Sequence, residues 1–210
     1  MSPRRFRMVD ATLSVLLGIV LSIVSCSPTP ADPDSASVDD QLVSLQDTQT
    51  LAGVNKLEQQ GDSRANQPRP DANAPGACKS VFGQEVAFGT NFTKFHNETY
   101  SGEADAASGT LAPIVVVSQS VGTYAQDAEA SKHLDGLVPA LKECSALNDP
   151  AFNFQITTHE SSALELQSPN KFAVTYRVKS GKLVGVSVIG LANSDQVASK
   201  IIEKITSRIA

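Results

Sequence analysis

The chain has 210 residues, and its 17 lysines and arginines stand against 22 aspartates and glutamates, a formal net charge of −5. This acidic balance argues against nucleic acid and anionic lipid head groups as partners, because both require a basic surface. The length is sufficient for one domain with a sizeable core.

The amino terminus has the pattern of a secretory signal peptide. Three arginines among the first ten residues precede an apolar run from Ala11 to Val24. As a helix ending at Ser25, this run would be about 22 Å long, which is short against a hydrocarbon core of about 30 Å. We therefore expect residues 1–25 to be a cleaved signal rather than a membrane span.

Cys26 closes a lipobox-like Ile-Val-Ser-Cys motif, in which the cysteine thiol receives diacylglycerol before the signal is cut. We expect Cys26 to anchor the chain to the extracytoplasmic face of a membrane, and residues 26–37, rich in Pro, Ser and Asp, to form a flexible tether. The alternative is an ordinary signal peptide with a cysteine near its cleavage point. Cleavage leaves 14 basic and 21 acidic residues, a net charge of −7, which again disfavours nucleic acid.

The first part of the domain is predicted to be helical, then irregular. Val38 to Gln60 has leucines and valines at helical spacing, and Ser44 is a plausible cap for its second half, so two short helices are an alternative to one. Gly61 to Gly76 is rich in Pro, Gly and Asn and predicts an exposed loop. Cys78 to Phe82 predicts a short helical turn.

Two strands and a long helix follow. Phe88 to Thr99 alternates apolar and polar residues as an edge strand does, and Pro113 to Ser120 is the strongest strand signal in the chain. Tyr124 to Cys144 has helical periodicity, although Pro139 is expected to interrupt the helix or end its regular part.

The remainder predicts three strands and a helix. The strands are expected at Phe152 to Thr158, Phe172 to Lys179 and Leu183 to Ile189, the last two joined by a Ser180-Gly181 hairpin turn. Ser194 to Ile209 has one apolar face and predicts a helix capped by Ser194 or by the asparagine before it. This order predicts an α+β fold over residues 38–210, with a mainly antiparallel sheet of about five strands packed against helices.

Cysteine counting predicts one disulfide. With Cys26 taken by lipid, Cys78 and Cys144 remain as an even pair in a compartment that permits disulfides. Two buried free thiols are the alternative.

Val117 to Cys144 resembles the central signature of the PknH-like extracellular sensor domain, in which a strand ending in Val-Gly-x-Tyr, here Val121 to Tyr124, leads into a helix that closes on a cysteine. Further similar segments are Leu42 to Val54, Cys78 to Gly83, Val184 to Ile189 and Asn193 to Ile209. Members of this family occur on a mycobacterial kinase and as free-standing lipoproteins. The resemblance implies a sensor-like domain with a ligand cleft between sheet and helices.

The chain departs from the family pattern in having two domain cysteines rather than four and no tryptophan, and Gly190 stands about where a further cysteine is expected. These departures put a second disulfide, and any ligand site built around it, in doubt. No kinase domain is present in the sequence, so the resemblance implies a stand-alone relative.

Four aromatic residues are the candidate ligand-binding residues. Tyr124 lies where a strand turns into the long helix and could line a cleft with Phe95, Tyr100 and Tyr176. The alternative is that Tyr124 is a core residue anchoring that turn.

The three histidines are weak candidates for chemistry. His96-Asn-Glu lacks the cysteines of a zinc deaminase, His133 falls on the polar part of a helix, and His159 stands near Ser161 and Ser162 without a nucleophile elbow. We expect no metal and no cofactor. The leading hypothesis is a non-enzymatic lipoprotein that binds an unidentified small or extended envelope ligand. The alternatives are a protein-interaction module and, third, a hydrolase using His159.

Overall fold

The computed structural model describes residues 38–60, 65–105, 111–159, 162–169 and 172–210. Ala36–Ala210 forms one compact unit, and every described helix and strand lies inside it. The predicted signal, the cysteine expected to accept a lipid (Cys26) and the predicted tether lie outside the described residues. Among the described helices, none has the length and apolar character needed to cross a membrane.

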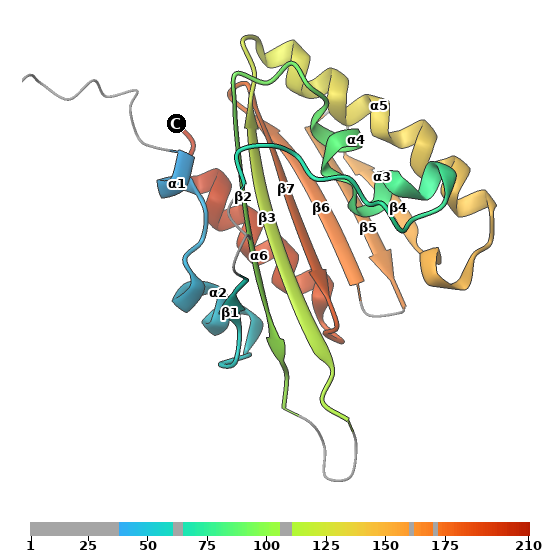
Figure 1. The fold of residues 1–210 in the computed structure, drawn as a ribbon. Helices are drawn as coiled ribbons and strands as arrows, with labels where there is room; N and C mark the ends of the chain where they lie inside the picture. The colour runs from blue at the N-terminus through green and yellow to red at the C-terminus, as the bar shows by residue number, and fades with distance from the viewer. Residues whose placement is uncertain (1–37, 61–64, 106–110, 160–161, 170–171) are drawn as a thin grey trace, which may run out of the picture. The chain divides into compact units, whose positions relative to one another are not determined.

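The centre of this unit is an antiparallel sheet in the order β1-β2-β3-β7-β6-β5-β4 (Figure 1). The α+β class is confirmed, but the sheet has seven strands rather than about five. Two strands were not predicted, because β1 is only two residues long and β5 has only two large apolar side chains. The strands are β1 Glu58–Gln59, β2 Lys94–Glu103, β3 Ile114–Thr123, β4 Gln155–His159, β5 Ala163–Ser168, β6 Phe172–Lys179 and β7 Lys182–Ile189.

One face of the sheet, the α6 face, packs against α6 (Ser194–Ser207), α1 (Val38–Gln41) and α2 (Leu45–Ala52). Alternate residues of β3 and β7 point to this face, because successive side chains of a strand alternate. Residues of this core that are at most 1% exposed include Val115, Val117, Val121, Val184, Val186, Val188, Ile201, Ile202 and Ile205.

The opposite face, the α5 face, packs against α5 (Asp127–Ala146), α3 (Lys79–Phe82) and α4 (Gln84–Phe88). The segment 65–75 crosses in front of β2 and β3 to reach the 3-10 turn η1 (Gly76–Cys78) and α3 (Figure 1). A second apolar core lies on this side, so the sheet is the middle of three layers. Its most buried members include Val81, Phe88, Leu134, Leu137, Leu141, Leu164, Leu166 and Leu183.

Helix α5 continues through Pro139, so the predicted interruption at this residue is wrong. Proline removes the backbone donor to the carbonyl four residues earlier, here that of Asp135. Both Pro139 and Asp135 are exposed, so water can hydrate that carbonyl and the helix persists.

The predicted helix cap and hairpin turn are confirmed, whereas the start of the first long strand lies later in the chain than predicted. Ser44 caps α2, its Oγ accepting from the Asp47 amide at 3.2 Å. Ser180 and Gly181 both have positive φ, 46° and 69°, as a type I′ hairpin turn requires. Residue 88, predicted to begin a strand, instead ends α4, and β2 starts at Lys94.

Candidate functional site

The structure gathers three of the four candidate aromatic residues on the α5 face. Phe95 and Tyr176 pack edge to face against Phe88, with ring centroids at 5.1 and 6.3 Å, and the Tyr124 hydroxyl donates to the Phe88 carbonyl at 2.7 Å. All three are at most 5% exposed. Because they are buried, these side chains support a site from within the core and are not accessible to a ligand along their length. Of the three, only Tyr176 lines the cleft described below.

Tyr100 does not join this group. Its side chain lies in the core of the α6 face, is 1% exposed and donates a hydrogen bond to the Val43 carbonyl at 3.1 Å. Phe95 and Tyr100 are an odd number of residues apart on β2, so their side chains leave opposite faces of the sheet. The four aromatics therefore do not line a single cleft.

A cleft of about 190 Å³ opens on the α5 face, between α3, α4 and the middle of the sheet. The volume is below the 300–1,000 Å³ common for drug-sized ligands, so it suits a small ligand or one unit of a longer one. The walls are apolar and the floor carries hydroxyls. The lining residues are Phe82, Gln84, Phe88, Val116, Ser118, Ser120, Val174, Tyr176, Gly185, Val186, Ser187 and Ile189.

Gln84, Ser118 and Ser120 of the cleft belong to a network of neutral polar side chains centred on the buried Asn97, which lies beside the floor and does not itself line the cleft. Its Oδ1 accepts from Gln84 Nε2 at 2.6 Å and from the hydroxyls of Ser118 and Ser120, each at 3.0 Å. Thr99 donates in turn to the Ser118 hydroxyl at 3.1 Å. A carbonyl oxygen has two lone pairs, so three donors compete for it and a hydroxyl can turn toward a ligand without leaving this oxygen unpaired.

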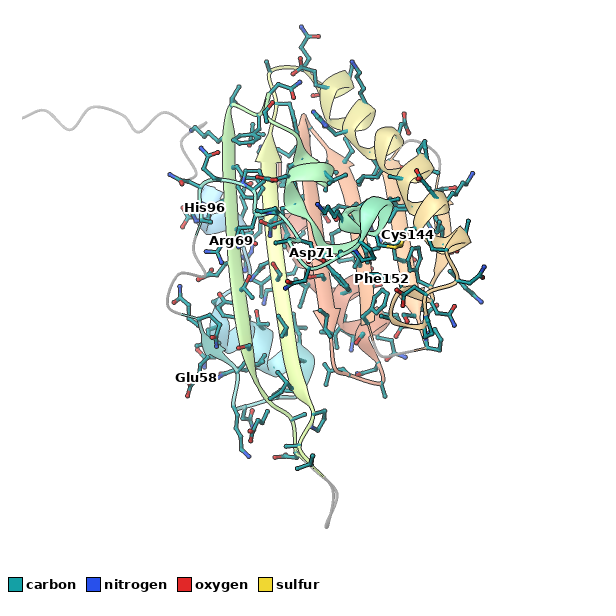
Figure 2. All side chains as sticks on the ribbon, turned by 45° about the vertical axis from the view of Figure 1, so that its right-hand side comes forward. Glu58, Arg69, Asp71, His96, Cys144 and Phe152 are labelled. Atoms are coloured by element: carbon teal, nitrogen blue, oxygen red, sulfur yellow. A yellow bond between two sulfur atoms is a disulfide. The ribbon has the colours of Figure 1, made fainter. Side chains whose placement is uncertain are left out.

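Gln84 is held in place by the segment that crosses the sheet. Its Oε1 accepts from the Arg69 amide at 3.1 Å, which leaves Nε2 to face Asn97 and Ser120. Figure 2 labels Arg69 and Asp71 on this segment, in front of the sheet. The crossing segment thus orients the one amide side chain that lines the cleft.

No lining residue of this cleft carries a charge. The only titratable group among them is the Tyr176 phenol, and burial raises its pKa well above the ordinary value, so it stays neutral. The cleft therefore offers hydrogen bonds without a counter-ion.

A disulfide joins the helical segments that cover the α5 face. Cys78 and Cys144 are bonded, which confirms the predicted pair and links η1, just before α3, to the far end of α5 (Figure 2). Both cysteines are fully buried. This bond ties the carboxyl-terminal end of α5 to the α3–α4 segment above the cleft.

The histidines do not form a catalytic arrangement in the described residues. His133 packs on the Tyr124 ring, with centroids 5.0 Å apart, and its Nε2 lies 3.1 Å from Asn91 Oδ1. Burial lowers the pKa of His133, with a smaller opposing effect from Glu129. His96 lies on β2, on the same strand face as Tyr100.

His159 lies at the exposed end of β4, where its Nε2 is 3.9 Å from Glu165 Oε1. Ser162 donates to the backbone carbonyl of His159 rather than to its ring, and Ser161 lies outside the described residues. Among the described residues, no group of three or more His, Cys, Asp or Glu side chains could hold a metal ion.

Sequence reasoning missed the polar floor. Gln84 and Asn97 gave no motif, because their roles depend on partners from other elements. The available signal was the pair Ser118 and Ser120, two small hydroxyls on one face of an otherwise β-branched strand.

Comparisons with known proteins agree on one family. A family model described as the PknH-like extracellular domain matches residues 33–208. The crystal structure of the extracellular domain of PknH from Mycobacterium tuberculosis superimposes with a TM-score of 0.53 at 14% identity, over 81% of this chain and 95% of that one. At this identity the likeness shows the fold. Among curated proteins, no match was found.

Proposed function

Because this chain belongs to the family of PknH-like extracellular domains, we propose that it is an extracytoplasmic sensor-type domain whose cleft beside α4 binds a small uncharged ligand. The extracytoplasmic location follows from the family, and the disulfide between Cys78 and Cys144 fits an oxidising compartment. Binding in the cleft and the chemical class of the ligand are the proposed steps.

The observation that carries this proposal is the neutral polar floor within apolar walls. A charged ligand would lose its hydration in the cleft without meeting an opposite charge, which is costly. An uncharged ligand bearing hydroxyl or amide groups can accept from Ser118 and exchange hydrogen bonds with Ser187. Apolar parts of the same ligand would contact Phe82 and Ile189.

A thermal-shift assay on the chain from Ala36 onward tests the proposal with matched neutral and charged compounds. N-acetylglucosamine against glucosamine, glucose against glucuronate, and a fatty amide against its fatty acid are suitable pairs. We expect stabilisation by a neutral member and little by its charged counterpart.

A cleft-filling variant locates the binding. Ser187→Phe places a large ring on the cleft floor and should abolish the stabilisation, whereas Thr157→Phe, on the exposed part of β4, should retain it. Stabilisation by charged members alone, or stabilisation that persists in Ser187→Phe, would contradict the assignment.

We further propose that Cys26 carries the lipid anchor. The support is the lipobox-like motif at the end of the apolar run, followed by a polar tether. Mass spectrometry of the membrane fraction should show an acylated amino-terminal Cys26. In a Cys26→Ser variant the anchor should be lost, and an unmodified wild-type residue would refute the anchor while leaving the cleft proposal intact.

A further inference from the structure

The two edges of the sheet are protected to different degrees. An edge strand leaves a row of backbone N–H and C=O groups unpaired, and proteins guard such edges with charges, prolines, bulges or very short strands. β1, at one edge, is only two residues long and carries the charged Glu58. Beyond β1, Ala65 covers part of β2 through an isolated bridge to Asn97. This edge therefore offers little backbone to another strand.

The opposite edge strand, β4, has none of these protections. It pairs with β5 alone, along all five of its residues and without a bulge. Its side chains are exposed except for the half-buried Ile156. The strand contains no proline and no Lys, Arg, Asp or Glu. In a chain with a formal net charge of −5, β4 is a neutral and regular edge that is open to a further strand.

The sequence of β4 is complementary to itself when a second copy runs antiparallel to it. With Thr157 on the twofold axis, Thr157 lies opposite its own counterpart, Gln155 lies opposite His159, and Ile156 lies opposite Thr158. Threonine pairs on neighbouring strands are favourable, and no pair brings two carboxylates or two lysines together. A twofold axis also makes the contact isologous, so each copy uses the same surface and both exposed edges are closed.

A hollow beside the start of β4 gives the side chain of a second copy a place to lie. Gln155, Thr157 and His159 point to the α6 face, because Ile156 between them packs against the core of the α5 face. A hollow of about 550 Å³, lined by Gln155 and Gln167 among others, opens at the Gln155 end of the strand. In the antiparallel pair the ring of His159, 56% exposed in a single copy, meets this hollow, where side-chain amides can hydrogen-bond an imidazole.

From these observations we infer that two copies of this chain associate through β4, antiparallel and centred on Thr157, so that their sheets join edge to edge. The occupant is a second copy, because the neutral strand has no charge to select an acidic or a basic partner and supplies its own counterpart at every position. The contact is small, so the dimer is weak and forms at high local concentration. It uses no residue of the cleft and is independent of the proposed cleft ligand.

The test is sedimentation velocity of the disulfide-bonded chain from Ala36 onward, between about 10 µM and about 1 mM, a range that suits a weak interface. We expect the sedimentation coefficient to rise with concentration toward that of a dimer. Thr157→Lys places two like charges opposite each other on the twofold axis and should weaken association about tenfold. Thr157→Glu should weaken it similarly, whereas an equimolar mixture of the two variants should associate at least as tightly as the wild type, since opposite charges then meet.

The matched control is Gln46→Lys, which adds the same charge to an exposed position of α2. Because the chain is acidic, a lysine there reduces general repulsion, so association should stay unchanged or strengthen. Equal weakening in Gln46→Lys, or a mixture of the two Thr157 variants that stays monomeric, would overturn the edge-to-edge dimer. A wild type that stays monomeric over the whole range would overturn it as well, even if β4 then bound an unrelated extended peptide.

Cysteine cross-linking tests the register separately from the affinity. The chain from Ala36 onward has no free thiol, since Cys78 and Cys144 are bonded to each other. Thr157→Cys places two thiols opposite each other, with Cβ atoms about 4.5–5.5 Å apart, and should form a covalent dimer with oxidised glutathione. Thr158→Cys points to the other face of the sheet and lies opposite Ile156 of the second copy, so it should form about tenfold less. Equal cross-linking of the two variants would show random collision and contradict the register.

Discussion

The side-chain amide of Gln119 hydrogen-bonds both backbone groups of Val43, which lies 76 residues earlier in the chain. The Val43 amide donates to Gln119 Oε1 at 2.8 Å, and Gln119 Nε2 donates to the Val43 carbonyl at 2.6 Å. Both residues are fully buried. A glutamine in the middle of the sheet thus provides the backbone pairing that fastens the segment between α1 and α2 to the α6 face.

Replacing this glutamine should be among the most destabilising single changes in the domain. Gln119→Ala leaves two buried backbone groups of Val43 with fewer partners and opens a cavity, so we expect a loss of about 2–4 kcal/mol in the free energy of unfolding. Urea denaturation measures this loss. The exposed Gln46→Ala on α2 is the control and should stay within about 0.5 kcal/mol. Equal losses of stability in the two variants would refute the role of Gln119 in fastening the segment around Val43 to the sheet.

The disulfide should contribute strongly to stability, since it closes a loop of 66 residues. The chain-entropy relation assigns such a loop about 4 kcal/mol. The double variant Cys78→Ser, Cys144→Ser should therefore unfold at a lower urea concentration than the oxidised wild type, and reduced wild-type protein should behave like the variant. A reduced protein that keeps the oxidised midpoint would contradict this expectation.

Gly185 allows two aromatic rings to approach the sheet. A Cβ at this position would lie 2.8 Å from the Tyr176 ring and 3.2 Å from the Phe88 ring, and both rings are buried. Gly185→Ala should cost about 1–3 kcal/mol, because the rings must shift within a packed core. Urea denaturation and near-ultraviolet circular dichroism would record the loss and the movement of the rings. An unchanged free energy of unfolding would show that the two rings can shift without cost, which contradicts this prediction.

At Gly136 we expect alanine to have the opposite effect, a gain in the free energy of unfolding. It lies inside α5, is exposed, and a Cβ there would meet nothing within 4 Å. Gly136→Ala should raise the free energy of unfolding by about 0.5–1 kcal/mol, because alanine loses less backbone entropy in a helix. If both glycine variants shifted the urea midpoint in the same direction, the packing distinction between the two sites would be wrong.

Sequence reasoning recovered what local patterns encode. The serine cap at Ser44, the Ser180-Gly181 turn and the apolar faces of α5 and α6 depend on neighbours within a few residues, and the cysteine pair follows from counting. The pairing of Gln119 with Val43 depends on residues distant in sequence, and no local rule marks a glutamine for burial.

The same limit explains the candidate site. Phe95, Tyr124 and Tyr176 belong to one core cluster, yet their burial makes them supports for the cleft, and Tyr100 faces the other side of the sheet. Asn97 joins the polar network beside the cleft only once α4 brings Gln84 to it. Strand alternation places Phe95 and Tyr100 on opposite faces once the extent of β2 is known.

Alkaline pH should weaken the domain through its buried tyrosines. Burial raises the pKa of Tyr176, and burial with a smaller effect of Glu129 raises the pKa of Tyr124, both well above the unfolded value of about 10. Above about pH 10 the unfolded chain releases these protons while the folded domain retains them. The stabilisation is therefore complete below about pH 10 and is lost as the pH rises, by up to about 1.4 kcal/mol per pH unit for each tyrosine.

The measurement is the free energy of unfolding in urea from about pH 8 to pH 11, with the disulfide intact. Tyr176→Phe should leave the stability near pH 8 almost unchanged, because no residue that the structure describes accepts a hydrogen bond from this hydroxyl, and should reduce the alkaline slope. Tyr124→Phe should reduce the slope too, but should already cost about 1–2 kcal/mol at pH 8 through the lost bond to the Phe88 carbonyl. A slope that neither variant changes would assign the alkaline loss to groups other than these two phenols.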